Sequence, residues 1–251
     1  MSHTVRQPCY EETKEVDIIE EVISKVAGGR VLDVATQEGH FVRLLMKNLQ
    51  SYTQIVGIDV DRDAIKKAQE TIIDKNIQFL SMNAERMDFA NESFDTISIS
   101  ASLHHLPSIQ QVLLEIRRVL KSGGSFILAE MHRDGQTDAE LTSVYLHHWV
   151  GDVDTALGFV HNHTLGRQEL VAHVETLGLR QVKFHDVHDR DTEPMEKIYI
   201  KQLDELIKRV TQRAKSTTSY EEMKKRGDEL RRRLYKVGAQ REPRLIVIGK
   251  K

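Results

Sequence analysis

Two carboxylates in the first quarter of the chain have the spacing of a ligand site. Asp33 stands in a short apolar run, Val31–Val34, and a small and polar stretch leads from it to Gly39. Apolar residues at helical spacing follow, which predicts a buried strand, a tight turn and a helix whose first N–H groups face a ligand. Asp59 ends the next apolar run, Gln54–Asp59, where nucleotide-binding α/β folds place the acid that binds a ribose diol. We therefore expect a cofactor site at the turn and Asp59.

A second group of residues that could take part in binding or catalysis is rich in histidine. His148 and Asp152 stand four residues apart on a predicted helix and so share one face, and His161 and His163 follow soon after. One interpretation is a site for zinc, iron or manganese, for which these side chains are suitable ligands. A second is that they accept protons from a polar substrate or donate hydrogen bonds to it. A third is that they are surface or capping residues, and the sequence leaves all three open.

Length and composition exclude several classes of protein. With 251 residues, 39% hydrophobic and 29% charged, the chain has the composition of a globular protein with one large α/β domain and insertions. Its apolar runs are only strand-length, which predicts no membrane span. The first residues lack the apolar core of a secretory signal, and Cys9 is the only cysteine. We expect a cytoplasmic protein without an intramolecular disulfide.

The net charge of -2 is unevenly distributed along the chain. Residues 192–251 contain 17 Lys and Arg against 9 Asp and Glu, so the rest of the chain is acidic. A basic segment attracts anionic partners, including nucleic acid. However, acidic and basic residues alternate through Glu221–Leu234, and this pattern is typical of a solvated helix face. We therefore do not expect a nucleic-acid partner.

The whole chain shows strand patterns alternating with helical patterns, which predicts a mostly parallel sheet covered on both faces. Strands are expected at residues 31–34, 54–59, 77–81, 96–100, 125–131, 181–187 and 243–249. Helices are expected at residues 11–26, from 61 onward, and at 108–120, 137–158, 167–177 and 194–237, the last with a break near 216–219. A turn is expected over Lys121–Gly124, just before the fifth strand.

Six motifs, in this order and spacing, resemble those of class I S-adenosylmethionine-dependent methyltransferases: Val31–Gly39, Asp59, Asn83-Ala84, Ser93–Asp95, Leu103–Leu106 and Leu120–Gly124. The likeness is greatest to the branch that includes enzymes of ubiquinone and menaquinone biosynthesis. The resemblance implies an α/β fold with a Rossmann-like seven-stranded sheet, mostly parallel, whose last strand is antiparallel. It also implies S-adenosyl-L-methionine as the cofactor.

The resemblance further implies which residues contact the cofactor. Asp33 would orient the turn and the amino-acid end of the cofactor, and Asp59 would accept hydrogen bonds from the ribose hydroxyls. Asn83-Ala84 would face the adenine, and Ser100-Ala101 would lie near the methionine portion. The full set of expected cofactor contacts is Asp33, Ala35, Gln37, Gly39, Asp59, Val60, Asn83, Ala84, Ser100 and Ala101.

The turn departs from the family pattern, which is usually acid-x-Gly-x-Gly-x-Gly. Ala35 and Gln37 replace the first two glycines, and only Gly39 remains. Ala35 fits if its φ is negative. Gln37 is harder to place, because a Cβ opposes a left-handed backbone and crowds an approaching ligand. Either Gln37 turns its side chain outward, or the cofactor sits differently, or cofactor binding has been lost; the other motifs argue against loss.

Two insertions are expected to form a helical cap over the substrate pocket, at residues 134–163 and 192–242, because they follow carboxyl ends of strands or their neighbours. The core would then comprise residues 28–133, 164–191 and 243–251, after a lead-in helix in residues 1–27. Candidate catalytic bases are His105, which the resemblance places near the substrate mouth, and His148 and His163. Candidate substrate contacts are Tyr145, Trp149 and His161, and candidate metal ligands are His148, Asp152, His161 and His163.

The function predicted from these features is transfer of a methyl group to a small molecule by in-line displacement. An RNA or protein methyltransferase that docks its substrate on the basic Lys224–Lys236 segment is one alternative. A cofactor-binding protein without transfer activity is another, suggested by Gln37. The cap helices are also a candidate surface for a homodimer.

Overall fold

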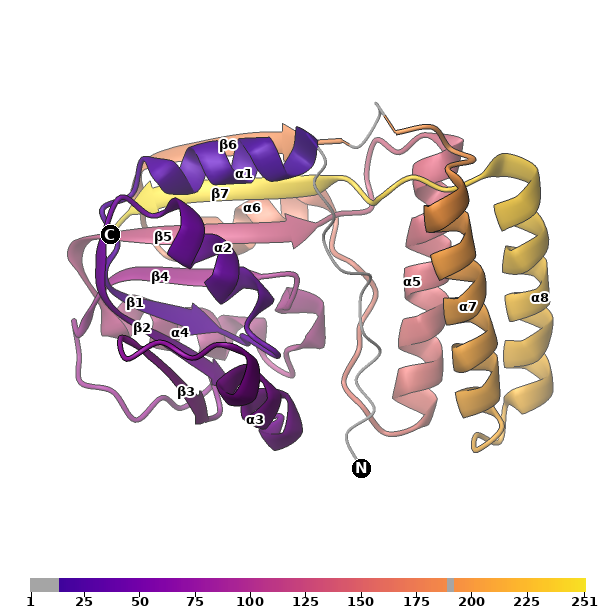
Figure 1. Ribbon diagram of the computed structural model, residues 1–251, viewed down its shortest axis with the longest axis horizontal. Helices are drawn as coiled ribbons and strands as arrows, with labels where there is room; N and C mark the ends of the chain where they lie inside the picture. The colour runs from indigo at the N-terminus through magenta and orange to yellow at the C-terminus, as the bar shows by residue number, and fades with distance from the viewer. Residues whose placement is uncertain (1–13, 189–191) are drawn as a thin grey trace.

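A seven-stranded sheet lies at the centre of the protein, of which the computed structural model describes residues 14–188 and 192–251. The strand order is β3-β2-β1-β4-β5-β7-β6. The strands are β1 (Gly29–Val34), β2 (Tyr52–Asp59), β3 (Ile77–Ser81), β4 (Phe94–Ser100), β5 (Leu120–Met131), β6 (Arg180–Val187) and β7 (Arg244–Lys250). Pairs from β3 to β5 are parallel, whereas β7 is antiparallel to β5 and β6. The Rossmann-like topology is confirmed (Figure 1).

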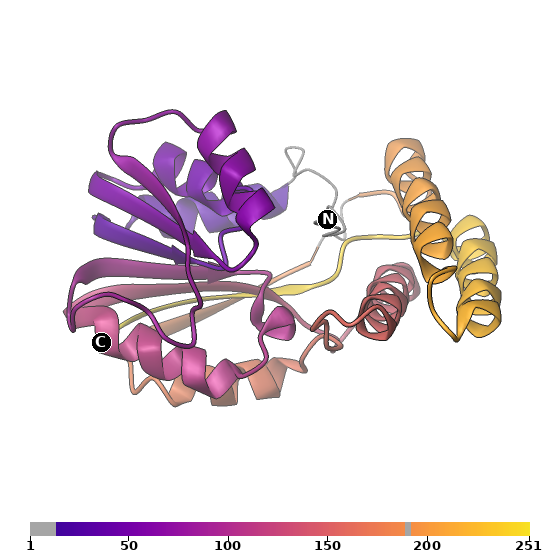
Figure 2. The ribbon, with the colours of Figure 1, turned by 90° about the horizontal axis from the view of Figure 1, so that it is seen from below.

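Helices cover both faces of this sheet (Figure 2). One face packs on α1 (Lys14–Ser24), α2 (His40–Asn48) and α3 (Arg62–Thr71), and the other on α4 (Ile109–Val119) and α6 (Arg167–Glu175). Strands buried on both faces need continuous apolar sequence, as in Val31–Val34, where only Asp33 is polar. Residues 11–13 of the expected lead-in helix, and Cys9, lie outside the described residues.

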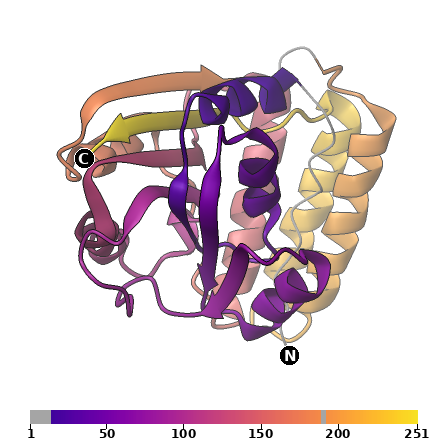
Figure 3. The same ribbon diagram turned by 60° about the vertical axis from the view of Figure 1, so that its left-hand side comes forward.

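Three further helices form a separate layer: α5 (Asp138–Ala156), α7 (Lys197–Ala214) and α8 (Tyr220–Val237). They lie side by side and share a hydrophobic core of their own, centred on Trp149 (Figure 3). Thr137 and Glu140 form a capping box at the start of α5, and the predicted break near residues 216–219 separates α7 from α8. This helical layer, α5–α7–α8, faces the carboxyl edge of the parallel strands (Figure 1). No helix in the described ranges is both long and apolar enough to cross a membrane.

The sheet register brings the expected site residues to this carboxyl edge. Asp33 of β1 pairs in register with Gly57 of β2 and Ser98 of β4, and Asp59 of β2 pairs with Ser81 of β3. Asp61 caps α3 by accepting the N–H groups of residues 63 and 64. The loops after β1, β2, β3 and β4 are therefore held side by side, as ligand sites of open α/β sheets require.

One local expectation is wrong. The fifth strand begins at Leu120 rather than Ser125, because Phe94 of β4 already pairs with Leu120. The glycines expected to form a turn instead make an irregularity within the strand. Gly123 has φ 77°, and the register of the β4–β5 pair shifts between Phe94 and Thr96.

Candidate cofactor site and histidine cluster

The turn after β1 retains a left-handed backbone without the usual glycines. Ala35 has φ 55°, Gln37 has φ 47° and Gly39 has φ 78°. The condition under which Ala35 would fit without strain, a negative φ, is therefore not met. A Cβ in this region costs roughly 1–2 kcal/mol, so both substituted positions are strained. The backbone path that glycines would permit is kept, with Ala35 and Gln37 bearing the strain.

Gly39 remains a glycine for a second reason besides its φ. A Cβ at this position would lie 2.6 Å from Cδ1 of Ile72 and 3.1 Å from the ring of Phe79. Gly39 is also the N-cap of α2 and offers no side chain to the first N–H groups of that helix. These groups lie at the positive end of the helix dipole, which favours a ligand with negative or hydrogen-bond-accepting atoms.

Asp59 joins the turn to the end of β2. Its Oδ2 accepts the backbone N–H of Gln37 at 2.9 Å, and its Oδ1 accepts that of Asp61 at 2.9 Å. Burial raises the pKa of Asp59, and these backbone hydrogen bonds oppose the rise. Each carboxylate oxygen keeps a further lone pair, so Asp59 can still accept two hydroxyl groups of a diol.

Asp33 lies beneath the turn and is only 1% exposed. Its Oδ1 accepts the hydroxyl of Ser98 at 2.7 Å. Burial raises the pKa of Asp33 to about 6, because a carboxylate is poorly solvated there. The side chain therefore connects the end of β1 to Ser98 of β4, and its expected role as an orienting group stays a prediction.

The loops after β2 and β3 supply a polar and an apolar group near Asp59. Asn83 is exposed, and its Oδ1 accepts the N–H of Glu85 at 2.8 Å, so its amide NH₂ is held in one orientation. Ala84 is buried, whereas Val60 is 66% exposed immediately after Asp59. An exposed apolar side chain beside a hydrogen-bonding amide suits a flat heterocycle such as adenine.

The loop after β4 is organised by Glu130, which sequence reasoning missed. This carboxylate is 1% exposed, and its Oε2 accepts the N–H groups of Ser102 and Leu103 at 2.8 Å each. Just before them, Ala101 has φ 45° and its N–H donates to the carbonyl of Ala129. The sequence feature that could have revealed Glu130 is an acidic residue within the otherwise apolar end of β5. Glu130 thereby fixes the backbone at residues 100–105, where Ser100 and Ala101 were expected to contact the cofactor.

Four histidine rings meet beside this loop. His104 and His105 belong to the short 3₁₀ helix Leu103–His105, His147 to α5, and His161 to the segment after α5. The ring centroids of His105 and His161 are 4.2 Å apart, and those of His104 and His147 are 4.8 Å apart. His161 Nε2 lies 3.2 Å from His147 Nε2. We call these four residues the histidine cluster; sequence analysis named only His105 and His161 from it.

The other two candidate bases form a separate pair. The rings of His148 and His163 stack at 4.2 Å with an interplanar angle of 1°. His148 Nε2 is hydrogen-bonded to Thr164 Oγ1, and His163 Nε2 to Asp152, which also binds Arg226. The four residues considered as metal ligands from the sequence are thus not gathered into one group.

Burial governs the protonation of these rings. It lowers the pKa of His105 to about 2, with neighbouring histidines adding to the effect, and that of His148 to about 4. Both imidazoles are therefore neutral near pH 7. A group with such a low pKa is poorly matched to remove a proton at that pH, although it can accept a hydrogen bond.

The two aromatic residues expected to contact the substrate differ in exposure. Trp149 is fully buried between α5, α7 and α8, and its indole N–H donates to the carbonyl of Met223 at 2.9 Å. A substrate contact does not fit this burial. Tyr145 is 44% exposed and lies beneath the guanidinium of Arg233 on α8. Trp149 therefore belongs to the packing of the helical layer, whereas a substrate contact by Tyr145 stays a prediction.

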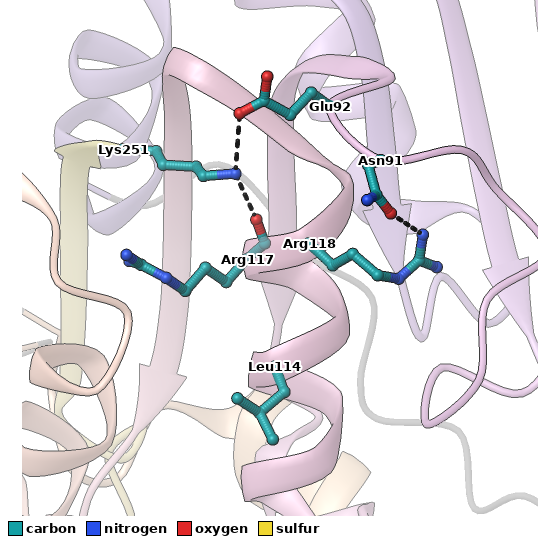
Figure 4. Close-up of a pocket in the computed structure, with 6 residues that line it drawn as sticks. All are labelled: Asn91, Glu92, Leu114, Arg117, Arg118 and Lys251. Carbon is teal, nitrogen blue, oxygen red and sulfur yellow. Dashed lines mark hydrogen bonds and ion pairs between the residues drawn. The ribbon is translucent and has the colours of Figure 1, made fainter.

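An open depression lies at the opposite, amino-terminal edge of the sheet (Figure 4). Lys251 donates there to Glu92 and to the carbonyl of Arg117, while Arg118 binds Asn91. These mutual contacts stabilise the packing of α4 against the strand ends. The depression is remote from the turn and from Asp59, so we do not assign it to the cofactor site.

Comparison with known proteins matches the same part of the chain. Residues 32–128 match the family described as a methyltransferase domain. This range contains the turn, Asp59, Asn83 and the loop after β4. Together with the relatives below, this match supports a class I S-adenosylmethionine-dependent methyltransferase domain over these residues. The resemblance noted from the sequence motifs is confirmed.

The methyltransferase domain has relatives of named function. The ubiquinone/menaquinone biosynthesis C-methyltransferase UbiE of Ectopseudomonas mendocina is 29% identical over 43% of this chain and 44% of its own length. The demethylmenaquinone methyltransferase of Thermotoga maritima is 30% identical over 55% of this chain and 60% of its own length. The chain thus spans about half the length of these curated relatives. The YcgJ protein of Bacillus subtilis has the same fold, with a TM-score of 0.60 and 18% identity over 95% of this chain and 98% of its own.

Proposed function

We propose that the protein transfers the methyl group of S-adenosylmethionine to a small-molecule acceptor by in-line displacement. The observation that carries this proposal is the hydrogen bond between Gln37 N and Asp59 Oδ2. It joins the turn and the ribose-binding acid into one unit, although two glycines of the turn are replaced. The methyltransferase domain match covers both residues.

The residues present suit this cofactor. The left-handed turn presents backbone N–H groups at the start of α2, and Asp59 has carboxylate lone pairs for a ribose diol. Val60 and Asn83 are both exposed and both near Asp59, where the adenine would lie. The presence of Gln37 in place of the family's glycine adds strain to the turn but leaves its backbone path intact. We therefore infer that cofactor binding is retained.

The cofactor, when bound, supplies an electrophilic sulfonium methyl group. The protein's own contribution is to hold the acceptor in line with that group at near-attack distance, roughly 3–3.5 Å. The loop over residues 100–105 is the part best placed to do so, since Glu130 fixes its backbone and His105 lies at its end. We infer that His105 contacts the acceptor and that the helical layer α5–α7–α8 closes the site from the other side.

A small acceptor is favoured over RNA by the pairing of basic side chains on α8. Arg226 binds Asp152 at 2.6 Å, and Arg231 binds Asp204 at 2.5 Å. Arg233 donates to Thr142 and to the carbonyl of Asp138. These arginines hold the helical layer together, and their charges are largely neutralised within it. The UbiE relatives are named for C-methylation in ubiquinone and menaquinone biosynthesis, which is consistent with a small-molecule acceptor here.

Calorimetric titration with S-adenosylmethionine and S-adenosylhomocysteine tests the proposal. We expect micromolar binding to the wild-type protein. Asp59→Ala should weaken it about 10- to 100-fold, because hydrogen bonds to a charged acceptor contribute about 1.5–3 kcal/mol. Asp63→Ala, at an exposed acid on α3, is the matched control and should bind as the wild type does. Absence of binding to the folded wild-type protein, or equal binding by Asp59→Ala, would overturn the proposal.

A further inference from the structure

The histidine cluster contains an arrangement that packing alone does not require. One ring nitrogen from each of His104, His105 and His161 lies within 4.8 Å of the other two. His104 is 2% exposed, and its Nε2 has no hydrogen-bond partner among the described residues. Buried polar atoms are nearly always satisfied, so an unpartnered imidazole nitrogen in a group of three imidazoles needs an explanation. A bound cation would supply the missing partner.

The geometry points to a binding site for a divalent transition metal of the zinc type, held by ring nitrogens of His104, His105 and His161. Ligand nitrogens around a tetrahedral zinc lie about 3.3 Å apart, given Zn–N distances of about 2.0–2.1 Å. The present spacing extends up to 4.8 Å, so metal binding would draw the rings together, with His105 the least buried of the three. This inference rests on the geometry of the three rings and not on the proposed methyl transfer, although His105 has a part in both.

The second nitrogen of two of these rings is already held by a carboxylate, as in protein metal sites. Glu130 Oε1 lies 3.2 Å from His104 Nδ1, and Asp154 Oδ2 lies 2.8 Å from His161 Nδ1. His105 is hydrogen-bonded to the backbone of Val160. Carboxylates behind the rings fix the tautomer, so that the opposite nitrogens of His104 and His161 carry lone pairs. Asp154 is itself held by Arg213, which makes this support rigid.

The class of metal follows from the ligand type. Imidazole nitrogens suit zinc, iron, nickel and copper, whereas magnesium and calcium prefer oxygen ligands. Three histidines leave one coordination position, which is typical of sites that bind a water or substrate atom. His147 lies beside the cluster centre, with its Nε2 at 3.2 Å from His161 Nε2. We assign zinc(II) as the metal to be tested.

The site would connect the sheet to the helical layer. His104 and His105 follow β4, whereas His161 follows α5, and the N–H of Asn162 already donates to the carbonyl of His104 at 2.8 Å. A metal bound between these two segments would hold them at a fixed separation. Metal binding is therefore expected to raise the unfolding temperature as well as to occupy the site.

The test uses the full chain purified without a polyhistidine tag, stripped with a chelator and then titrated with Zn²⁺ and with Co²⁺ as a spectroscopic probe. We expect one equivalent to bind, visible absorption bands of low-coordinate Co²⁺, and a higher unfolding temperature. His105→Ala and His161→Ala should each weaken binding at least 100-fold. His163→Ala is the matched control, because it lies two residues from His161 but outside the cluster, and should bind as the wild type does.

A second variant tests the site with a substitution that is less disruptive to the fold. Glu130→Gln keeps the volume of the side chain and should weaken metal binding about 10- to 100-fold, as loss of a carboxylate behind a ligand does elsewhere. Circular dichroism confirms that each variant is folded. Absence of stoichiometric binding to the wild-type protein, or an equal effect of His161→Ala and His163→Ala, would overturn the assignment.

Discussion

The backbone N–H of Gln37 donates to Oδ2 of Asp59 over 2.9 Å. This bond connects the first loop of the sheet to the second, and it is made by the residue that departs most from the glycine pattern of the family. Because the donor is a backbone group, the bond depends on the left-handed conformation of Gln37 and not on its side chain. The turn can therefore keep its left-handed path with a residue other than glycine, at a cost in strain.

Replacement of Gln37 by glycine should relieve that strain. A left-handed non-glycine residue costs roughly 1–2 kcal/mol, and the added chain entropy of glycine offsets about 0.5–1 kcal/mol of the gain. We expect Gln37→Gly to raise the free energy of unfolding by about 0.5–1 kcal/mol, with cofactor affinity equal or tighter. Chemical denaturation measures the first quantity and calorimetry the second.

The control for this variant is Ala64→Gly in α3, where the backbone is helical. It should lower the free energy of unfolding by about 1 kcal/mol, since glycine is a poor helix former. Destabilisation by both variants would contradict the strained conformation of Gln37.

Gly39→Ala should be destabilising by about 1–3 kcal/mol, because its Cβ would overlap Ile72 in addition to opposing φ 78°. Gly123→Ala separates the two effects. Gly123 has φ 77°, and a Cβ at this position would meet no atom within 4 Å, so only the backbone strain applies. The difference between the losses of unfolding free energy in the two variants measures the steric overlap at the start of α2. Equal losses of stability in urea unfolding would argue against that overlap.

Stability should depend on the ionisation of Asp33. Burial raises its pKa to about 6 in the folded protein, above its usual value of 3.8. The folded state therefore holds this proton more tightly than the unfolded state, and the resulting stability is present below about pH 4 and lost as the pH rises through about 6. The full loss amounts to about 3 kcal/mol, from about two pKa units.

Asp33→Asn removes this titration. We expect the variant to gain stability relative to the wild type as the pH rises from about 4 to 7, in denaturation curves measured at each pH. A stability difference that does not change with pH would show that Asp33 keeps an ordinary pKa in the folded protein.

Trp149 is the only tryptophan in the chain, so the fluorescence of the wild-type protein reports on the helical layer α5–α7–α8.

Trp149→Phe removes the indole N–H and leaves the carbonyl of Met223 without that partner, which should lower the free energy of unfolding by about 1–3 kcal/mol in chemical denaturation. Because Trp149 is buried away from Asp59, binding of S-adenosylhomocysteine should be unchanged. Weaker binding by a folded variant would contradict this separation.

The features that depend on local pattern could be predicted from the sequence. The strand ending at Asp59 and the break between α7 and α8 were predicted because apolar periodicity and turn residues are local signals. The start of β5 at Leu120 was missed, because pairing with Phe94 overrides the glycines that follow. Local pattern therefore predicts the order of elements better than their ends.

The contacts that individual side chains make were harder to predict. Glu130 and His147 were missed because their roles depend on segments far away in the sequence, and Trp149 was assigned to a pocket although it packs against α8. On an amphipathic helix, periodicity indicates the face of a side chain but not the element that covers it. The histidine cluster becomes visible only when the segments after β4 and α5 are brought together.

The most direct measurement is a crystal structure of the protein with S-adenosylhomocysteine. We predict both ribose hydroxyls within about 2.6–3.0 Å of the Asp59 carboxylate oxygens, with the Gln37 N–H still bound to Oδ2. The turn should keep its left-handed path, and the adenine should lie beside Val60 and Asn83. A ribose bound elsewhere, or a turn that has to refold around Gln37 to admit the ligand, would contradict this assignment of the cofactor site.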